Sequence, residues 1–371
     1  MKIRSTKINT VRKTLTTAIF LLTVLILLAA AGCAGSENNN EEQQGEEEST
    51  VTERPAEGNL IKVDPASADI GIWYSVWYKY DPEDPDDVRK NLWKDWDIRY
   101  EPILPDGTYG LYDSGDKELI MFHLKELTEA GIDFIIMDQT NHIDVGSGFI
   151  SDRAVAVAKC IQEWNDAGNK PIRYCSAIGA IQWEPNGKVI EDEVVLLYNR
   201  YLRKDWGKSY YMVDGKPLLV VYGDGGEQIW KDYKDAGGKS KYTDNFTMRW
   251  ADNQSRPGYY GWAYDKGTQQ DENVMVVMPG WDNRKGHTPV PRNHGEWYRN
   301  SWKQVFTAPT APKIIVINSF NEYAENTGVH SALTEYYGDD APDLYWNMTK
   351  QYIKLFREGG WFDPDNNLPE S

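Results

Sequence analysis

The chain has 371 residues, of which 40 are basic and 57 are acidic, and its formal net charge is −17 at pH 7. This acidic balance argues against a nucleic-acid partner and against adhesion to an anionic membrane surface. The aromatic residues are biased toward rings that carry a polar group, since 15 Trp and 23 Tyr accompany only 9 Phe. Such rings suit stacking on sugars, although they also serve ordinary cores.

The N-terminal segment is predicted to be an export signal rather than part of the fold. Five basic residues precede an apolar stretch, 18–31, which is too short for a membrane-spanning helix. The stretch leads into Leu-Ala-Ala-Ala-Gly-Cys33, which resembles the lipobox of bacterial lipoproteins. The resemblance implies that residues 1–32 are a lipoprotein signal peptide and that Cys33 becomes the acylated first residue. The expected location is therefore extracytoplasmic, with a lipid anchor in a bacterial membrane.

Residues 33–58 are rich in Asn, Gln, Glu and Ser and contain almost nothing apolar, so a disordered acidic tether is predicted there. The remainder, 59–371, is long enough for one large domain. An exported context permits a disulfide between Cys160 and Cys175, but two buried free thiols are the favoured interpretation.

Apolar and β-branched runs predict eight strands, and 3.6-residue periodicity predicts helices between most of them. The expected strands are 70–78, 132–137, 172–178, 217–222, 246–251, 259–263, 274–278 and 314–317. The expected helices are 116–130, 151–167, 191–205, 227–236, 296–306 and 344–358. This alternation is typical of a (β/α)8 TIM barrel more than of an open doubly wound sheet. Two places fit less well: no helix precedes 259–263, and 79–115 is a long aromatic loop of the kind that usually has a function.

In such a barrel, functional groups gather at the C-terminal ends of the strands. Polar and aromatic residues at those ends are candidates for binding the hydroxyls and rings of a sugar. They are Trp77, Tyr78, Asp138, Asn141, His142, Tyr222, Trp250, Trp281, Asp282, Asn283, Asn321 and Tyr323. The sequence has no His or Cys spacing typical of zinc and no Gly-rich phosphate loop, so neither a metal nor a cofactor is expected.

Two acids, Glu322 and Glu325, follow the last predicted strand and stand three residues apart. If the turn is helical, their Cβ atoms lie about 5–6 Å apart. A carboxyl pair that flanks one glycosidic bond is the equipment of sugar hydrolysis. From spacing alone, two solvated acids on a loop are an alternative of about equal weight.

The segment Ile317-Asn-Ser-Phe-Asn-Glu-Tyr-Ala-Glu-Asn-Thr-Gly328 resembles a motif of glycoside hydrolase family 99 and its relatives. That group includes endo-acting α-mannosidases and WbsX-type proteins of polysaccharide gene clusters. Three other segments are similar in style and occur in the same order: Gly131–Asp138, Asp214–Val221 and Pro279–Arg284. The resemblance implies a (β/α)8 barrel and retaining hydrolysis without a metal in the chemistry.

The resemblance also implies roles for the two acids. Glu322 would help the sugar 2-hydroxyl to attack its own anomeric carbon, and Glu325 would protonate the leaving oxygen and later activate water. The Trp and Gly of the family motif are Tyr323 and Asn326 here, so the sugar pocket is expected to differ.

The expected function is therefore a retaining glycoside hydrolase acting on a poly- or oligosaccharide at the cell envelope, with an α-mannan-type glycan as one candidate. Two alternatives remain: a non-catalytic glycan-binding lipoprotein, and a WbsX-like polysaccharide-biosynthesis protein. The expected partners are a glycan and, through the lipid at Cys33, a membrane. No nucleic acid and no obligate protein partner are expected.

Overall fold

The computed structural model describes residues 59–87, 89–143, 149–182, 184–253, 256–262, 268–269 and 273–366. The predicted signal peptide, Cys33 and the predicted tether lie outside these ranges. Within them, no helix combines the length and the apolar character that crossing a bilayer requires.

The described strands and helices alternate along the chain, largely where the sequence predicts them. The strands are β1 (Ile61–Val63), β2 (Asp69–Ser75), β3 (Tyr100–Pro102), β4 (Phe134–Gln139), β5 (Arg173–Ile178), β6 (Met212–Val213), β7 (Lys216–Tyr222), β8 (Thr247–Ala251), β9 (Thr268–Gln269), β10 (Val274–Val277), β11 (Ile314–Ile317), β12 (Ala332–Thr334) and β13 (Gly360–Phe362). The helices are α1 (Leu92–Asp95), α2 (Lys117–Ala130), α3 (Ile150–Asp166), α4 (Gly187–Leu197), α5 (Gly226–Asp235), α6 (Glu296–Phe306) and α7 (Leu344–Glu358). Short helical turns lie at Ala180–Gln182, Tyr198–Leu202, Asp205–Ser209, Thr243–Asn245, Asn293–Gly295 and Glu335–Tyr337.

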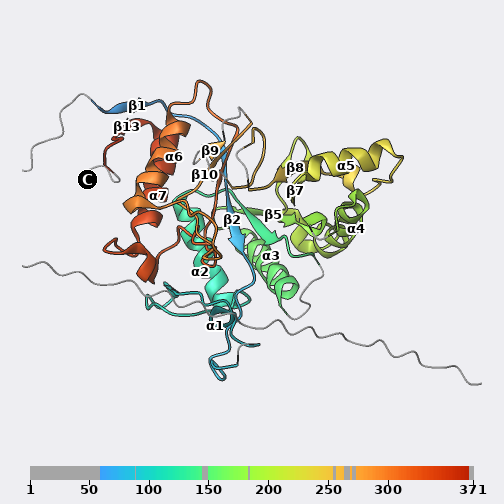
Figure 1. Cartoon of the computed structure of the whole chain (residues 1–371), viewed down its shortest axis with the longest axis horizontal. Coiled ribbons are helices and arrows are strands. Elements are labelled where there is room, and N and C mark those ends of the chain that lie inside the picture. Colours follow the sequence, from blue (N-terminus) through green and yellow to red (C-terminus); the bar gives the residue numbers. More distant parts are fainter. Residues whose placement is uncertain are drawn as a thin grey trace, which may run out of the picture. The chain divides into compact units, whose positions relative to one another are not determined.

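Seven strands form one curved parallel sheet, in the spatial order β8-β7-β5-β4-β2-β11-β10. Helices lie on the outside, with α6 and α7 on one side of the strands and α4 and α5 on the other (Figure 1). All four residues of β11 are buried, as the apolar run at 314–317 predicts. The sheet and its helices have the arrangement of a (β/α)8 barrel, which is the predicted fold class.

The eighth predicted strand, 259–263, does not form as such over its described residues. Instead, the backbone N–H groups of Tyr260 and Trp262 donate to the carbonyls of Trp250 and Asp252, at 2.8 and 3.1 Å. The chain approaches β8 so closely that a Cβ on Gly261 would lie 2.3 Å from the Asp252 oxygen. The segment 259–262 therefore lies beside β8, where the eighth strand of a barrel would stand.

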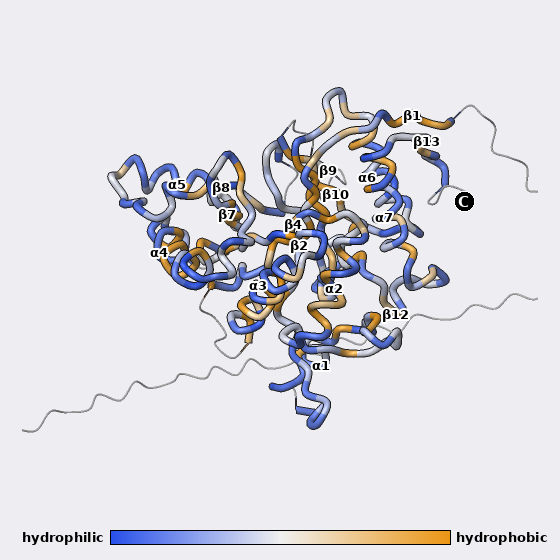
Figure 2. The backbone as a smooth tube through the Cα atoms, turned by 180° about the vertical axis from the view of Figure 1, so that it is seen from behind, coloured by the Kyte–Doolittle hydropathy of each residue, from blue (hydrophilic) through white to orange (hydrophobic). Residues whose placement is uncertain are grey.

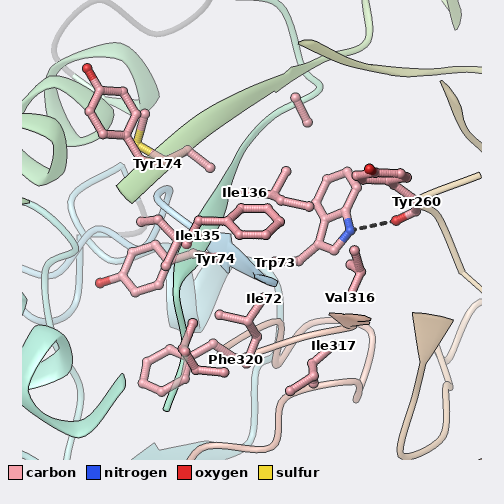
Figure 3. Close-up of a cluster of buried hydrophobic side chains, with 14 of the residues drawn as sticks. Ile72, Trp73, Tyr74, Ile135, Ile136, Tyr174, Tyr260, Val316, Ile317 and Phe320 are labelled. Atoms are coloured by element: carbon pink, nitrogen blue, oxygen red, sulfur yellow. Dashed lines mark hydrogen bonds between the residues drawn. The ribbon is translucent and has the colours of Figure 1, made fainter. Parts of the chain in front are cut away.

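Strand register separates the interior of the barrel from the layer beneath the helices. Trp73 of β2 donates its indole N–H to the Tyr260 carbonyl at 2.8 Å, so its side chain points inward. Ile136 and Val316 lie on the same side (Figure 3). On the opposite face, Tyr74 hydrogen-bonds His123 of α2 at 2.8 Å. Side chains alternate along a strand, so residues in register with Trp73 face the barrel interior and residues in register with Tyr74 face the helices.

The helices begin and end for local reasons. Asp116 caps α2 by accepting hydrogen bonds from the N–H groups of Glu118 and Leu119, and Gly131 ends the helix at φ 91°. Helices α6 and α7 have their predicted bounds. Helix α4 begins four residues before the predicted 191, because the Asn186 side chain accepts a hydrogen bond from the Lys188 N–H. Hydropathy follows this layout, since β10 and its neighbours are apolar and α5 is mostly polar (Figure 2).

Two cysteines, Cys160 on α3 and Cys175 on β5, are buried and free, as the favoured interpretation expects. Burial raises the pKa of the Cys160 thiol to about 11, and it also raises that of Cys175. Both thiols are therefore protonated core groups at neutral pH rather than reactive thiolates.

Two histidines are buried together between α2 and the segment that follows β11. The rings of His123 and His330 lie 5.0 Å apart, and both pack on Phe320. Among the described residues, neither Nε2 atom has a hydrogen-bond partner. Burial lowers the pKa of His123 to about 3, and burial together with the neighbouring His123 lowers that of His330. Both rings are therefore neutral in the folded chain.

This pair predicts a loss of stability on the acid side. An unfolded histidine titrates near pH 6.5, so between about pH 6.5 and pH 3 the unfolded chain binds more protons than the folded one. The free energy of unfolding should fall by about 1.4 kcal/mol per pH unit for His123 in that window, and the lowered pKa of His330 should add to the fall. Neither ring should contribute a slope above about pH 6.5. Urea unfolding measured from pH 7 to pH 4 checks this, and the His123→Gln variant should show a shallower slope. Replacing the exposed His294 should leave the slope of unfolding free energy against pH unchanged. Equal slopes for His123→Gln and the wild type would contradict the assignment of the slope to the buried pair.

A two-stranded antiparallel sheet joins the two ends of the described domain. Strand β1 pairs with β13, and Ile61 stands opposite Phe362 while Val63 stands opposite Gly360. The Asn59 amide also donates to Asp365 at 2.7 Å. A second small sheet, formed by β3 and β12, lies outside the barrel strands.

Candidate active site

The loop 318–330, which follows β11, is closed by its own backbone. The Ser319 N–H donates to the Thr327 carbonyl at 3.1 Å, and the N–H groups of Thr327 and Gly328 both donate to the Glu322 carbonyl at 3.0 and 3.1 Å. The residues between are a series of turns rather than the helical turn that the three-residue spacing suggests. Both candidate acids are therefore carried by one compact loop.

Glu322 is held between this loop and the end of β2. Its side chain is only 4% exposed. Oε2 accepts a hydrogen bond from the Ser75 hydroxyl at 3.2 Å, and Oε1 accepts one from the Glu325 N–H at 3.1 Å. The Glu322 N–H donates in turn to Ser319 Oγ at 2.9 Å. These bonds fix both the backbone and the carboxylate, so Glu322 is not a solvated surface acid.

Glu325 joins the same loop to the segment that follows β10. Its Oε2 accepts a hydrogen bond from the indole N–H of Trp281 at 3.1 Å. Its carbonyl accepts one from the Asp282 N–H at 3.0 Å. Two of the segments on which the sequence resemblance rests, around 281 and 322, are therefore in contact through Glu325.

The two carboxyl groups influence each other's protonation. Burial raises the pKa of Glu322 well above its usual range, and the charges of Glu325 and Asp138 raise it further. Burial also raises the pKa of Glu325, which the Trp281 N–H partly offsets. Glu322 is the more deeply buried, yet it accepts two hydrogen bonds to one on Glu325, and donors stabilise the charged form. The pair therefore retains a proton at pH values where an ordinary glutamate has lost it, and the donor count favours placing the negative charge on Glu322.

Asp138 and Tyr222 face the same interior as these acids. Asp138 pairs with Ser75 in the sheet, so its side chain lies on the same inward face as that of Trp73. Its Oδ1 accepts hydrogen bonds from the Thr140 N–H and hydroxyl at 3.0 and 2.8 Å, while burial raises its pKa. The phenol of Tyr222, on the inward face of β7, also has a raised pKa, through burial first and then through the charge of Glu325. Acids and a phenol thus converge at the C-terminal ends of β2, β4, β7 and β11.

Three predicted substrate-binding residues lie beneath the loop instead of in the site. Tyr78, Asn321 and Tyr323 are fully buried. The Tyr78 hydroxyl donates to the Asn321 carbonyl at 2.7 Å and accepts from the Tyr323 N–H at 2.9 Å. The Asn321 amide pairs with both backbone groups of Ser75, at 2.8 and 3.0 Å. The structure therefore gives these three residues internal partners, and they hold the loop against β2.

Trp250 is also outside the barrel interior. It stands in register with Val221, on the face opposite Tyr222, and its ring lies against Gly226 at the start of α5. Strand parity therefore places its side chain on the helix side of the sheet rather than in the barrel interior.

The remaining predicted residues lie on the loops around the mouth. Nδ1 of His142 lies 2.7 Å from Oε1 of the buried Glu193 on α4, and Asn141 precedes it, half-buried. Asp282 and Asn283 use their side chains within their own loop, since each accepts a hydrogen bond from a backbone N–H two residues later. Trp77 is buried beside Trp96.

Sequence reasoning missed two arginines that hold the loop in place. Arg284 donates to the Ala324 and Asp97 carbonyls, each at 2.9 Å. The buried Arg292 donates to the Asn326 and Gly328 carbonyls at 2.9 and 2.6 Å. Arginine carries rigidly spaced donors, but no sequence pattern indicates which distant carbonyls receive them.

Asn326, which stands where the resembled motif has glycine, has a left-handed backbone conformation. Its φ is 55°, in the left-handed region that asparagine tolerates better than most other non-glycine residues. Its side-chain oxygen accepts a hydrogen bond from the Tyr100 hydroxyl. The substitution therefore preserves the turn.

A cleft of about 430 Å³ lies apart from the two glutamates. Its lining comes from the aromatic loop and the start of α2, and includes Tyr80, Leu104, Leu111 and Asp116. Because its lining includes none of the converging acids, the chemistry is assigned to the barrel mouth instead. In the described ranges, no cluster of three or more His, Cys, Asp or Glu side chains has the geometry of a metal site.

Among the solved structures that resemble this chain are two endo-alpha-mannosidases. One is the GH99 endo-alpha-mannosidase from Bacteroides thetaiotaomicron in complex with Bis-Tris propane, with 19% identity, a TM-score of 0.56, and coverage of 78% of this chain and 98% of that one. The other is a further structure of a GH99 endo-alpha-mannosidase from that organism, with 16% identity, a TM-score of 0.54 and the same coverage. These neighbours are (β/α)8 barrels, so the likeness confirms the predicted fold.

No protein-family profile matches the chain. No curated protein matches its sequence either.

Proposed function

We propose that this chain is a retaining glycoside hydrolase that acts on a poly- or oligosaccharide. The observation that carries the proposal is the pair of carboxyl groups on one loop after β11: the buried Glu322, whose Oε1 accepts a hydrogen bond from the Glu325 N–H at 3.1 Å, and the half-buried Glu325. Hydrolysis of a glycosidic bond needs one carboxyl group that donates a proton and one that supports the reacting anomeric carbon. The shared fold with two endo-alpha-mannosidases supports the same class of reaction.

In the proposed first step, Glu325 gives its proton to the leaving oxygen as the bond from that oxygen to the anomeric carbon breaks. Glu322 takes the proton of the sugar 2-hydroxyl while that oxygen bonds to the anomeric carbon, which gives a 1,2-anhydro sugar. In the second step, Glu325 removes a proton from water and the water oxygen bonds to the anomeric carbon as the bond from that carbon to the 2-oxygen breaks. Glu322 returns its proton to the released 2-oxygen. Two inversions at one carbon retain its configuration.

The direct test is incubation of the purified domain with a panel of glycans, followed by product analysis. An α-mannan-type glycan belongs in the panel because both similar structures are endo-alpha-mannosidases. The proposal expects new reducing ends whose anomeric configuration, read by NMR early in the reaction, matches that of the substrate. A protein that binds a glycan of the panel but releases no product would instead be a glycan-binding protein. Products of inverted configuration would contradict the retaining mechanism.

We also propose that the protein is lipid-anchored at the cell envelope through Cys33. The support is the order of a basic region, an apolar stretch and small residues before that cysteine. Mass spectrometry of the mature N-terminus should find acylated Cys33 as the first residue. A Cys33→Ser chain that is still processed before residue 33 and still partitions with membranes would contradict the proposal.

A further inference from the structure

We infer that the end of the barrel opposite its mouth rests on the membrane surface, through an exposed face of the small β1–β13 sheet. This face, called the Trp361 face below, consists of Leu60, Lys62 and Trp361. The inference rests on the proposed lipid at Cys33 and adds an orientation to it, in which the mouth of the barrel points away from the bilayer.

The small β1–β13 sheet has one buried face and one exposed face. Phe362 is buried, and the centroid of its ring lies 5.7 Å from that of Tyr352 on α7. Its neighbour Trp361 stands opposite Lys62 and is 59% exposed, more than any other large apolar side chain in the described ranges. Leu60, just before β1, is 42% exposed. Two apolar side chains are therefore open to the surroundings beside one long cationic side chain.

The connections of this sheet place it at the N-terminal ends of the barrel strands. β1 leads into β2, which begins at Asp69, and β13 follows the end of α7. The Ala66 N–H, between β1 and β2, donates to the Phe356 carbonyl of α7 at 2.9 Å. Arg357 of α7 donates to Asp133, which directly precedes β4, at 2.7 Å. Figure 1 shows β1 and β13 at one end of the described domain and α1, from the loop after β2, at the other.

The chemistry of the Trp361 face and the path of the chain both indicate a bilayer surface. Indole rings favour the membrane–water interface, and a lysine covers apolar surface with its stem while its charge stays in water. Lys62 Nζ lies 3.7 Å from Asp64, which partly balances its charge, so the contact does not depend on anionic lipid. The described chain begins at residue 59, so the chain from Cys33 enters the domain beside this face. A tether makes even a weak contact effective, because it holds the two surfaces at high local concentration.

The test uses the mature lipoprotein in phosphatidylcholine vesicles whose acyl chains carry bromine, which quenches the fluorescence of nearby indoles. Comparison of the wild type with Trp361→Phe isolates the emission of Trp361. Comparison with Trp96→Phe isolates that of Trp96, which is 38% exposed on the loop after β2, at the mouth end. Brominated lipid should remove most of the Trp361 emission and leave that of Trp96 unchanged. Equal quenching of the two rings, or no quenching of Trp361, would overturn the inference.

Two leucines provide a matched pair of variants, because Leu60 and Leu333 of β12 are both 42% exposed. Leu60→Glu places an acid in the membrane contact, so it should restore most of the Trp361 emission in brominated vesicles. Leu333→Glu should leave the quenching as in the wild type. Equal effects of the two substitutions would reject the Trp361 face as the contact. Matching thermal unfolding midpoints show that the variants are folded.

Failure of the lipid anchor is a separate result from failure of the orientation. If mass spectrometry finds no acyl group at Cys33, the anchor proposal fails, but chain 33–371 coupled through Cys33 to a maleimide lipid still tests the face. Cys160 and Cys175 do not compete for the maleimide, because both are buried. If a higher concentration of vesicle-free protein protects Trp361 from quenching by acrylamide, a second copy of the chain covers the face and the inference is wrong.

Discussion

Replacing Glu322 with glutamine should nearly abolish hydrolysis of every substrate, whatever its leaving group. The proposed first step requires a base for the sugar 2-hydroxyl, and an amide cannot accept that proton. Loss of a general base costs about 10²–10⁴-fold in rate, and the upper end is expected because no other group replaces it at the 2-hydroxyl. Initial rates of Glu322→Gln should therefore fall alike with a natural glycan and with a glycosyl fluoride. A 2-deoxy substrate should fail with the wild type for the same reason.

The matched control is Glu335→Gln, which makes the same substitution at an exposed acid paired with Arg99 on the surface. It should retain full activity, since surface ion pairs contribute little. Glutamine at 322 can still accept one hydrogen bond through its oxygen, either from Ser75 or from the Glu325 N–H, so the variant should fold. Normal hydrolysis by a folded Glu322→Gln would show that the chemistry lies elsewhere.

Replacing Glu325 with glutamine should slow hydrolysis of a substrate with a poor leaving group much more than that of a substrate with a good one. An acid/base group typically contributes about 10²–10⁴-fold, so hydrolysis of a natural glycan should nearly stop while binding persists. A glycosyl fluoride needs little protonation of its leaving group, so its first step should be much less affected. The kcat/KM values on both substrates, which report the first step, and the binding constant for the glycan measure this difference. Equal losses of kcat/KM on both substrates would show that Glu325 is not the acid that protonates the leaving oxygen.

The pH profile should change in the same variant. Glu325 donates its proton only while protonated, so wild-type activity should fall as pH rises through its pKa. Burial raises that pKa, so this basic limb should lie above the usual glutamate range. With the natural glycan as substrate, the residual kcat/KM of Glu325→Gln should lack the basic limb, because the residue that causes it can no longer titrate. The wild type should show little of this limb with the glycosyl fluoride, which needs little protonation of its leaving group. A basic limb that is unchanged would assign it to another group.

Much of the fold could be predicted because hydrophobic runs and helix caps are local features. The buried run 314–317, the cap at Asp116 and the end at Gly131 are all visible in the sequence, and the structure has them. The segment 259–262 could not be predicted correctly, because it lies beside β8 without forming a described strand of its own.

The site was harder to predict than the fold, because adjacent residues at a strand end face opposite ways. Tyr222 and Trp250 both look like rim residues in the sequence, but strand register turns one inward and the other toward α5. Tyr78 and Tyr323 carry rings of the kind that stack on sugars, yet both are buried, and the Tyr78 hydroxyl accepts a hydrogen bond from the backbone N–H of Tyr323. Which polar group is used inside the protein and which is left for a ligand depends on tertiary contacts that spacing does not encode.

If the proposed lipid at Cys33 holds the chain, the pairing of β1 with β13 has a mechanical consequence. A pull from the N-terminal side would load the Asn59–Asp365 hydrogen bond first, and then the pairs Ile61–Phe362 and Val63–Gly360. Only after these bonds and the one from the Ala66 N–H to the Phe356 carbonyl open would tension reach Asp69, where the barrel sheet begins. The small sheet would thus open first under force, while the strands that position Glu322 and Glu325 keep their geometry.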